Sequence, residues 1–238
     1  MKLEMARTTA LSGLVLAALL SPAWPAQAQD PKAPYPSMAP LDQYLMERNA
    51  EMALARSAAP ESISRDADVM VLGRHGFEAA VKGKNGFVCF VSRSWDAPFE
   101  SSEFWNPKVR APLCYNAPGA RTIAPLLLER AKLACAGLSK DQIAERTKAP
   151  RDRNEVPPLE PNAICYMMSK EAYLTDSDGH NLSHVMFYTP FVDGAVLGAG
   201  LPGSPVLIGH QPFPGAPVPV TEFFIPVGKW SDGTPASP

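Results

Sequence analysis

Two histidines and two aspartates gather in one polar turn in the second half of the sequence. Asp176, Asp178, His180 and His184 lie within nine residues, and apolar runs at 163–168 and 184–191 flank them. Carboxylate oxygens and imidazole nitrogens are common ligands of Zn²⁺ in proteins. The turn 176–184 therefore predicts a site for a divalent metal ion, with zinc as the first choice.

The metal prediction depends on the backbone between His180 and His184. On a helix, residues four apart are separated by about 6 Å in rise, whereas on a strand they are separated by about 13 Å. Zinc–nitrogen bonds are about 2 Å long, so one ion cannot reach both rings on a strand. The residues after His184, VMFYTPF, favour a strand. A shared ion thus requires the turn to curl back, and the alternative is a hydrogen-bonded turn with structural or exposed histidines.

Other polar side chains allow two further uses of the same turn. A small-molecule site would draw on five ligand-binding candidates: His75, Tyr166, Ser169, Lys170 and Tyr173. A hydrolase would use His184 or His180 as the general base and Ser169, or a metal-bound water, as the nucleophile. The sequence contains no G-x-S-x-G, S-x-x-K or H-E-x-x-H motif. Small-ligand or divalent-metal binding is the first hypothesis, and the hydrolase is its alternative.

The first 28 residues have the three parts of a removable export signal. Lys2 and Arg7 precede the apolar run Leu14–Leu20, and Ala26 and Ala28 form an A-x-A cleavage site. The apolar run is shorter than the roughly 20 residues that a bilayer requires, and no later stretch qualifies. We therefore expect a protein of the periplasm or the extracellular space, without a membrane span.

Charge and length restrict the class of protein. Beyond residue 28, 20 Lys and Arg residues face 23 Asp and Glu residues, and this near balance gives no basic patch for nucleic acid. A chain of this length holds one sizeable core. The expected organisation is a signal peptide (1–28), a Pro-rich arm (29–40), a single domain (41–232) and a disordered tail (233–238).

Strand patterns occur in two blocks with helical patterns between them. Helical spacing marks 41–58, a helix capped by Thr122 and ending at Ala136, and a short helix before Pro150 with a Ser139–Gln142 capping box. Asn85-Gly86 predicts a tight hairpin turn between the second and third strands. The seven expected strands are 69–73, 77–83, 87–95, 163–168, 184–191, 204–210 and 220–228. This order predicts an α+β fold with a mainly antiparallel sheet of about seven strands and two to three helices.

Four cysteines in an exported chain allow three disulfide connectivities. Pairing Cys89 with Cys114 closes the shorter loop and leaves Cys135 with Cys165. Free thiols that behave as small core residues are the alternative. Both interpretations stay open.

The segment 95–121 has no periodicity but is rich in aromatic residues. An ordered loop packed over the sheet is the favoured interpretation. If the large rings were exposed, they would form a contact surface together with the Pro-rich arm. That arrangement would suit a structural or interaction protein of the cell envelope; its four key side chains are Trp95, Phe99, Phe104 and Trp105.

Several segments resemble an uncharacterised family of exported bacterial proteins of about this length. The resemblance covers most of the chain after residue 28 and is carried by NGFVCFVSRSW, EFWNPK, YMMSK, HVMFY and LPGSPVL. It implies a single secreted domain. It implies no activity and no catalytic residue.

Overall fold

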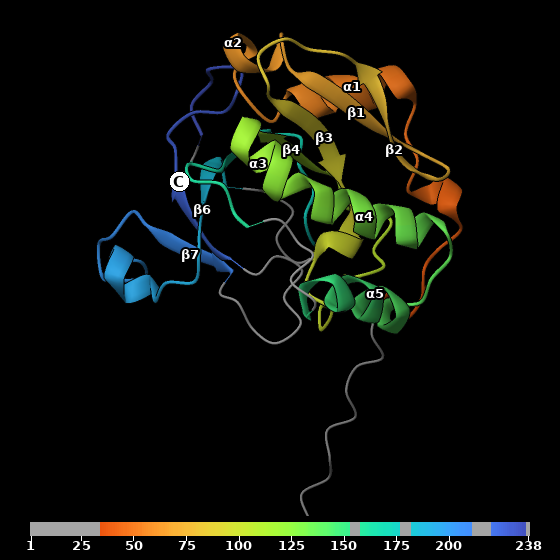
Figure 1. Ribbon diagram of the computed structural model, residues 1–238. Helices are drawn as coiled ribbons and strands as arrows, with labels where there is room; N and C mark the ends of the chain where they lie inside the picture. Colours follow the sequence, from red (N-terminus) through yellow and green to blue (C-terminus); the bar gives the residue numbers. More distant parts are fainter. Residues whose placement is uncertain (1–33, 153–157, 177–181, 211–219, 237–238) are drawn as a thin grey trace, which may run out of the picture. The chain divides into compact units, whose positions relative to one another are not determined.

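The computed structural model has an α+β fold built on one mainly antiparallel sheet (Figure 1). It describes residues 34–152, 158–176, 182–210 and 220–236. The described strands follow the order β2-β1-β3-β4-β5-β6-β8-β7 in the sheet. Their bounds are β1 Asp68–Gly73, β2 Gly76–Val81, β3 Val88–Ser92, β4 Ala111–Tyr115, β5 Ile164–Met167, β6 His184–Thr189, β7 Leu207–His210 and β8 Thr221–Pro226.

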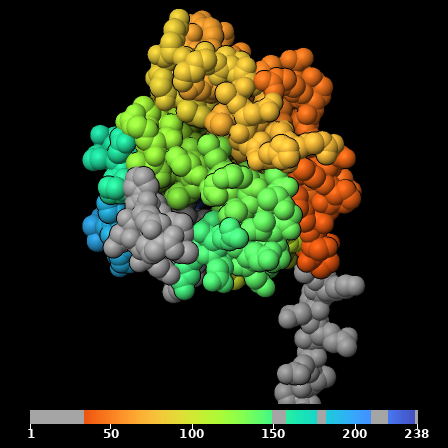
Figure 2. Space-filling model, turned by 45° about the vertical axis from the view of Figure 1, so that its right-hand side comes forward, coloured from red at the N-terminus to blue at the C-terminus, as the bar shows by residue number. Residues whose placement is uncertain are grey.

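Helices cover both faces of the sheet. On one face Ile123, Ala124 and Leu127 pack against side chains of β3, β4 and β6, and on the other Leu54 and Ala55 pack against β1, β3 and β4. Figure 2 shows α4 and α5 (green) beside the β1–β2 hairpin (orange to yellow). The helices are α1 Arg48–Arg56, α2 Glu61–Ser64, α3 Ala117–Thr122, α4 Ala124–Cys135 and α5 Lys140–Asp152, with 3-10 turns η1 Leu41–Gln43, η2 Ser94–Asp96 and η3 Gly194–Leu197.

The helix on the first face is interrupted, and its predicted cap was wrong. Asn116 caps α3 by accepting from the backbone N–H of Gly119 at 3.0 Å. Thr122 instead ends α3 and donates its hydroxyl to the carbonyl oxygen of Pro118. The capping box at α5 is confirmed, because Ser139 and Gln142 exchange hydrogen bonds of 2.9 and 3.3 Å. This helix continues to Asp152, past the end predicted before Pro150.

The hairpin predicted at Asn85-Gly86 was wrong in its pairing. Gly86 does turn with a φ of 78°, but among the described strands β2 pairs only with β1, which also runs parallel to β3. The chain after β2 instead crosses the segment before β1, where Lys84 N–H donates to the carbonyl oxygen of Asp66 at 2.9 Å. A Cβ on Gly83 would lie 2.3 Å from the carbonyl carbon of Ala67. Glycine is therefore required at this crossing.

The sheet has one strand more than predicted, and the chain has more helices. The strand β4 lies inside the segment that the sequence assigned to a loop, and it pairs with β3 over five residues from Val88↔Tyr115 to Ser92↔Ala111. Its sequence APLCY carries a proline and no alternation, which explains why the pattern was missed. The prediction that β3 is central and buried on both faces is confirmed, since it lies between β1 and β4.

One of the two disulfides that the sequence allows is present. Cys89 and Cys114 lie directly opposite each other on β3 and β4 and are joined. Cys135 and Cys165 are free, so the free-thiol alternative applies to this pair. Cys135 packs with the residues around Trp95, whereas Cys165 lies in the core under α3 and α4, and the two thiols therefore do not meet.

The aromatic loop packs onto the body, as the favoured interpretation predicted. Trp95, Phe104 and Trp105 are buried and Phe99 is partly buried. This packing buries three of the four rings that an envelope contact surface would expose. None of the helices among the described residues is long and apolar enough to cross a membrane.

Candidate functional site

The predicted metal turn is described only at its two ends. Asp178 and His180 lie outside the described residues. Asp176 accepts from Tyr35 (2.5 Å), Lys108 (2.7 Å) and Asn106 (3.2 Å), and also from Tyr173. These donors, with Lys108 first, hold the pKa of Asp176 far below its usual range. In this arrangement the carboxylate ties the Pro-rich arm to the body.

His184 begins β6, as the sequence predicted, and its ring is buried. Its Nδ1 donates to the carbonyl oxygen of Leu182 at 2.5 Å, and its ring packs on Phe224 with centroids 4.8 Å apart. Burial lowers the pKa of His184, opposed by the hydrogen bond to Leu182. The neutral ring therefore keeps a lone pair on Nε2.

The five ligand-binding candidates lie in different surroundings. Exposed His75 is in the β1–β2 turn. Tyr166 lies on the α1 side of the sheet, with its ring centroid 6.2 Å from that of Phe87. Ser169 shares a 2.7 Å hydrogen bond with the hydroxyl of Ser57, and Lys170 pairs with Asp232 at 2.6 Å. Of the five, only Tyr173 contacts a predicted metal ligand within the described part of the chain.

The zinc site and the hydrolase centred on this turn remain predictions. Within the described ranges, no group of three or more His, Cys, Asp or Glu side chains is arranged to hold a metal ion. Ser169 and His184 share no hydrogen bond there, and Ser169 is buried against Ser57.

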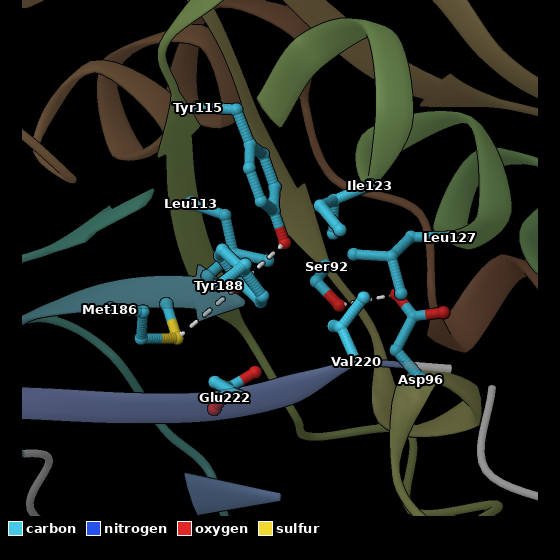
Figure 3. Close-up of a pocket in the computed structure, with 10 residues that line it drawn as sticks. All are labelled: Ser92, Asp96, Leu113, Tyr115, Ile123, Leu127, Met186, Tyr188, Val220 and Glu222. Atoms are coloured by element: carbon cyan, nitrogen blue, oxygen red, sulfur yellow. Dashed lines mark hydrogen bonds between the residues drawn. The ribbon is translucent and has the colours of Figure 1, made fainter. Parts of the chain in front are cut away.

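The structure contains a different candidate site, a cavity of about 130 Å³ between the sheet and the start of α4 (Figure 3). Its apolar side chains come from β4, α4 and β6, and also from the residue just before α4 and the residue just before β8. Five polar side chains share the same space. The lining residues are Ser92, Asp96, Leu113, Tyr115, Ile123, Leu127, Met186, Tyr188, Val220 and Glu222.

Strand alternation places these side chains on one face. Leu113 and Tyr115 are two apart on β4, and Met186 and Tyr188 are two apart on β6. Glu222 on β8 lies directly opposite Tyr188. Residues two apart, or opposite across a strand pair, share a face of the sheet, so these side chains point toward α3 and α4.

Asp96 is a carboxyl group in the cavity whose pKa is raised by burial. Its Oδ2 accepts from the Ser92 hydroxyl at 2.5 Å, while its Oδ1 is shielded from solvent and has no hydrogen-bond partner among the described residues. Burial raises the pKa of Asp96 to about 6, opposed by the nearby Arg130 charge and the hydrogen bond from Ser92. The carboxyl can therefore change its protonation state near neutral pH.

Two tyrosines form the opposite wall. The hydroxyls of Tyr115 and Tyr188 are 3.4 Å apart, and the Tyr188 hydroxyl also lies 3.6 Å from the sulfur of Met186. Burial raises the pKa of both phenols well above the ordinary value. Both therefore stay protonated at neutral pH and can donate a hydrogen bond to a ligand.

Sequence reasoning missed these residues, although a signal was present. Glu222 is the single charged residue in the apolar run VTEFFIPV, and a carboxylate within a strand pattern is unusual in a buried sheet. Tyr188 and Met186 lie in a run already assigned to a strand. No sequence pattern marked Asp96, because this residue reaches the cavity only through the way the loop that contains η2 packs over the sheet.

No protein-family model, curated protein or solved structure matches this chain. The described lining residues include no histidine or lysine beside Ser92, whose hydroxyl proton is directed at Asp96. The arrangement can enclose a small molecule, hydrogen-bond to it and exchange a proton with it.

Proposed function

We propose that this protein binds a small organic ligand in the cavity between the sheet and α4. The observation that carries the proposal is an apolar space of about 130 Å³ with five polar side chains on its wall. An engineered apolar cavity of about 150 Å³ holds benzene, so a molecule of similar size fits here. Ligand sites characteristically combine an apolar lining with a few polar groups that orient the ligand.

The compartment that we propose is the periplasm or the exterior of a bacterial cell. The export pattern in residues 1–28 and the resemblance to exported bacterial proteins support it. The Cys89–Cys114 disulfide is consistent with an oxidising compartment outside the cytoplasm.

Binding suits the cavity better than hydrolysis. A serine nucleophile needs a base that takes its proton and a group that orients the base. Ser92 has a carboxylate as its hydrogen-bond partner, and the part of the lining that the structure describes contains no imidazole.

A cavity-filling variant tests the proposal. Saturation-transfer NMR on the purified protein would use benzene, phenol, benzyl alcohol, isobutanol, isobutylamine and isobutyrate as probes. Leu127→Trp places a larger side chain at a lining position of α4. Leu126→Trp is the control, because it makes the same change at a neighbouring position that is not among the described lining residues. We expect at least one probe to bind the wild type and the Leu126 variant, and to lose its signal with Leu127→Trp.

Two results would contradict cavity binding. One is the absence of saturable binding for every probe at millimolar concentration. The other is equal binding by the wild type and a folded Leu127→Trp variant, because the probe would then occupy another place.

A further inference from the structure

Two buried phenols reach the cavity from different strands. Figure 3 shows the hydroxyl of Tyr115, on β4, directed toward that of Tyr188, on β6, inside the space that the lining encloses. Both side chains are almost fully buried, and their ring centroids are 6.1 Å apart. Burial raises the pKa of each phenol well above its ordinary value, so each oxygen keeps a proton that needs an acceptor.

The described partners of these two protons are weak ones. The oxygens of Tyr115 and Tyr188 are 3.4 Å apart, whereas an O–H···O hydrogen bond is ordinarily about 2.7 Å long. The Tyr188 hydroxyl otherwise reaches the sulfur of Met186 at 3.6 Å. Burial raises the pKa of the Cys165 thiol, and among the smaller effects a hydrogen bond from Tyr115 lowers it, so Tyr115 also has a sulfur beside it. Sulfur is a weak acceptor.

Only one of the two protons can lie between the two phenol oxygens. If Tyr115 donates to Tyr188, the proton of Tyr188 is left to Met186. If Tyr188 donates to Tyr115, the proton of Tyr115 is left to Cys165. Either arrangement gives one proton an oxygen at 3.4 Å and the other a sulfur. Because a buried donor with a poor acceptor still carries most of its desolvation cost, both phenols gain from a better acceptor.

A single acceptor oxygen would satisfy both phenols. A carbonyl oxygen has two lone pairs and accepts two hydrogen bonds. An oxygen about 2.7 Å from both phenol oxygens forms a triangle on their 3.4 Å separation, so both hydroxyl hydrogens can rotate toward it. Leu113, Leu127 and Val220 line the same space and provide an apolar surface for a short hydrocarbon body.

We infer that the ligand of this cavity is a small carbonyl compound, such as a ketone, aldehyde or amide on a short or single-ring hydrocarbon, whose oxygen accepts a hydrogen bond from Tyr115 and another from Tyr188. This inference rests on the proposed function and specifies the class of the ligand.

Two probes of nearly equal shape differ in the acceptor oxygen. Cyclopentanone carries a carbonyl oxygen at the position where methylenecyclopentane carries a CH₂ group. Both are similar in size to benzene, which an apolar cavity of about 150 Å³ holds. NMR titration of the purified protein measures the affinity of each probe, and we expect both to bind the wild type.

Tyrosine-to-phenylalanine variants assign the recognition to the two hydroxyls. Tyr115→Phe combined with Tyr188→Phe removes both hydroxyls and keeps both rings. Two lost hydrogen bonds should weaken cyclopentanone binding at least about tenfold, and methylenecyclopentane should bind no more weakly than to the wild type. The matched control Tyr35→Phe removes a hydroxyl that donates to Asp176, at a position that is not among the described lining residues, and should bind both probes as the wild type does.

The carbonyl group itself reports its hydrogen bonds. The carbon-13 resonance of a ketone carbonyl moves downfield when its oxygen accepts hydrogen bonds. Cyclopentanone labelled at that carbon should therefore resonate further downfield when bound to the wild type than when bound to Tyr115→Phe or to Tyr188→Phe. This comparison uses the single variants, so it holds even if the double variant does not fold.

The outcomes distinguish this inference from the proposed function. If cyclopentanone binds the wild type and the folded phenylalanine variants with equal affinity and an unchanged carbonyl resonance, the cavity is a ligand site and the carbonyl inference is wrong. Binding of methylenecyclopentane without binding of cyclopentanone also overturns it, as does an equal loss of both probes in the folded double variant. If none of these probes or the earlier ones binds, the proposed function itself fails.

Discussion

At the scale of single residues, Asp96 makes the stability of the protein depend on pH. Its pKa is raised from 3.8 to about 6, so the folded protein holds this proton at pH values where the unfolded chain has lost it. Stability from this group is fully present below about pH 4 and is lost as the pH rises toward 6. The shift corresponds to at most about 3 kcal/mol.

Asp96→Asn removes that ionisation and keeps an oxygen for the Ser92 hydroxyl. We expect the variant to gain about 1 to 3 kcal/mol over the wild type at pH 7.5 and nothing at pH 4. Urea unfolding at half-unit steps of pH measures the difference. Asp141→Asn on the exposed surface of α5 is the control and should follow the wild type. A constant difference between Asp96→Asn and the wild type across this range would contradict the assignment.

A second buried charge has a structural role. Arg93, at the end of β3, is fully buried and donates to Oε1 of Glu51 on α1 at 2.8 Å. The same oxygen accepts from the backbone N–H of Leu72 on β1. One carboxylate therefore joins the helix to two strands, and removing either charge would leave the other buried without compensation.

At the scale of elements, Gly83 controls how β2 leads into β3. Gly83→Ala would place a methyl group 2.3 Å from the backbone of Ala67, and neither backbone can move without losing the hydrogen bond from Lys84 to Asp66. We expect a loss of more than about 2 kcal/mol in the free energy of unfolding. Gly228→Ala is the control, since a Cβ there meets nothing within 4 Å. Equal urea midpoints for the two variants would contradict this account.

The same crossing shows which parts of the fold could be predicted from the sequence. The local signals at Asn85-Gly86 and at Ser139–Gln142 correctly predicted a turn and a capping box, because both depend on neighbouring residues. The strand order depends on the contact of Gly83 with Ala67 and Asp68, which no local pattern encodes.

The candidate site also depends on contacts between residues that are far apart in the sequence. Asp176 resembled a metal ligand because its sequence neighbours are polar, yet two of its four described partners, Tyr35 and Lys108, are 141 and 68 residues away. The cavity likewise joins Asp96 to Tyr188 and Glu222, which come from three separated segments. Residue types near each other in sequence could suggest a polar turn, but only the folded sheet brings the polar side chains of the cavity together.

At the scale of the whole molecule, the Cys89–Cys114 bond ties the two central strands across a sequence separation of 25 residues. Such a cross-link stabilises chiefly by restricting the unfolded chain, by about 3 kcal/mol for a loop of this size. Cys135 and Cys165 are free and contribute no such restriction. A protein that folds outside the cytoplasm would therefore carry one disulfide and two thiols.

Alkylation followed by mass spectrometry tests this state on protein exported to the periplasm. Unfolding without reduction should expose two reactive thiols, at Cys135 and Cys165, and reduction should expose all four. Cys89→Ala combined with Cys114→Ala should lower the free energy of unfolding by about 3 kcal/mol, whereas Cys135→Ser, at a partly buried position, should cost less. Labelling of four thiols before reduction would show that the bond does not form in that compartment, and the proposed location of the protein would then lose its main structural support.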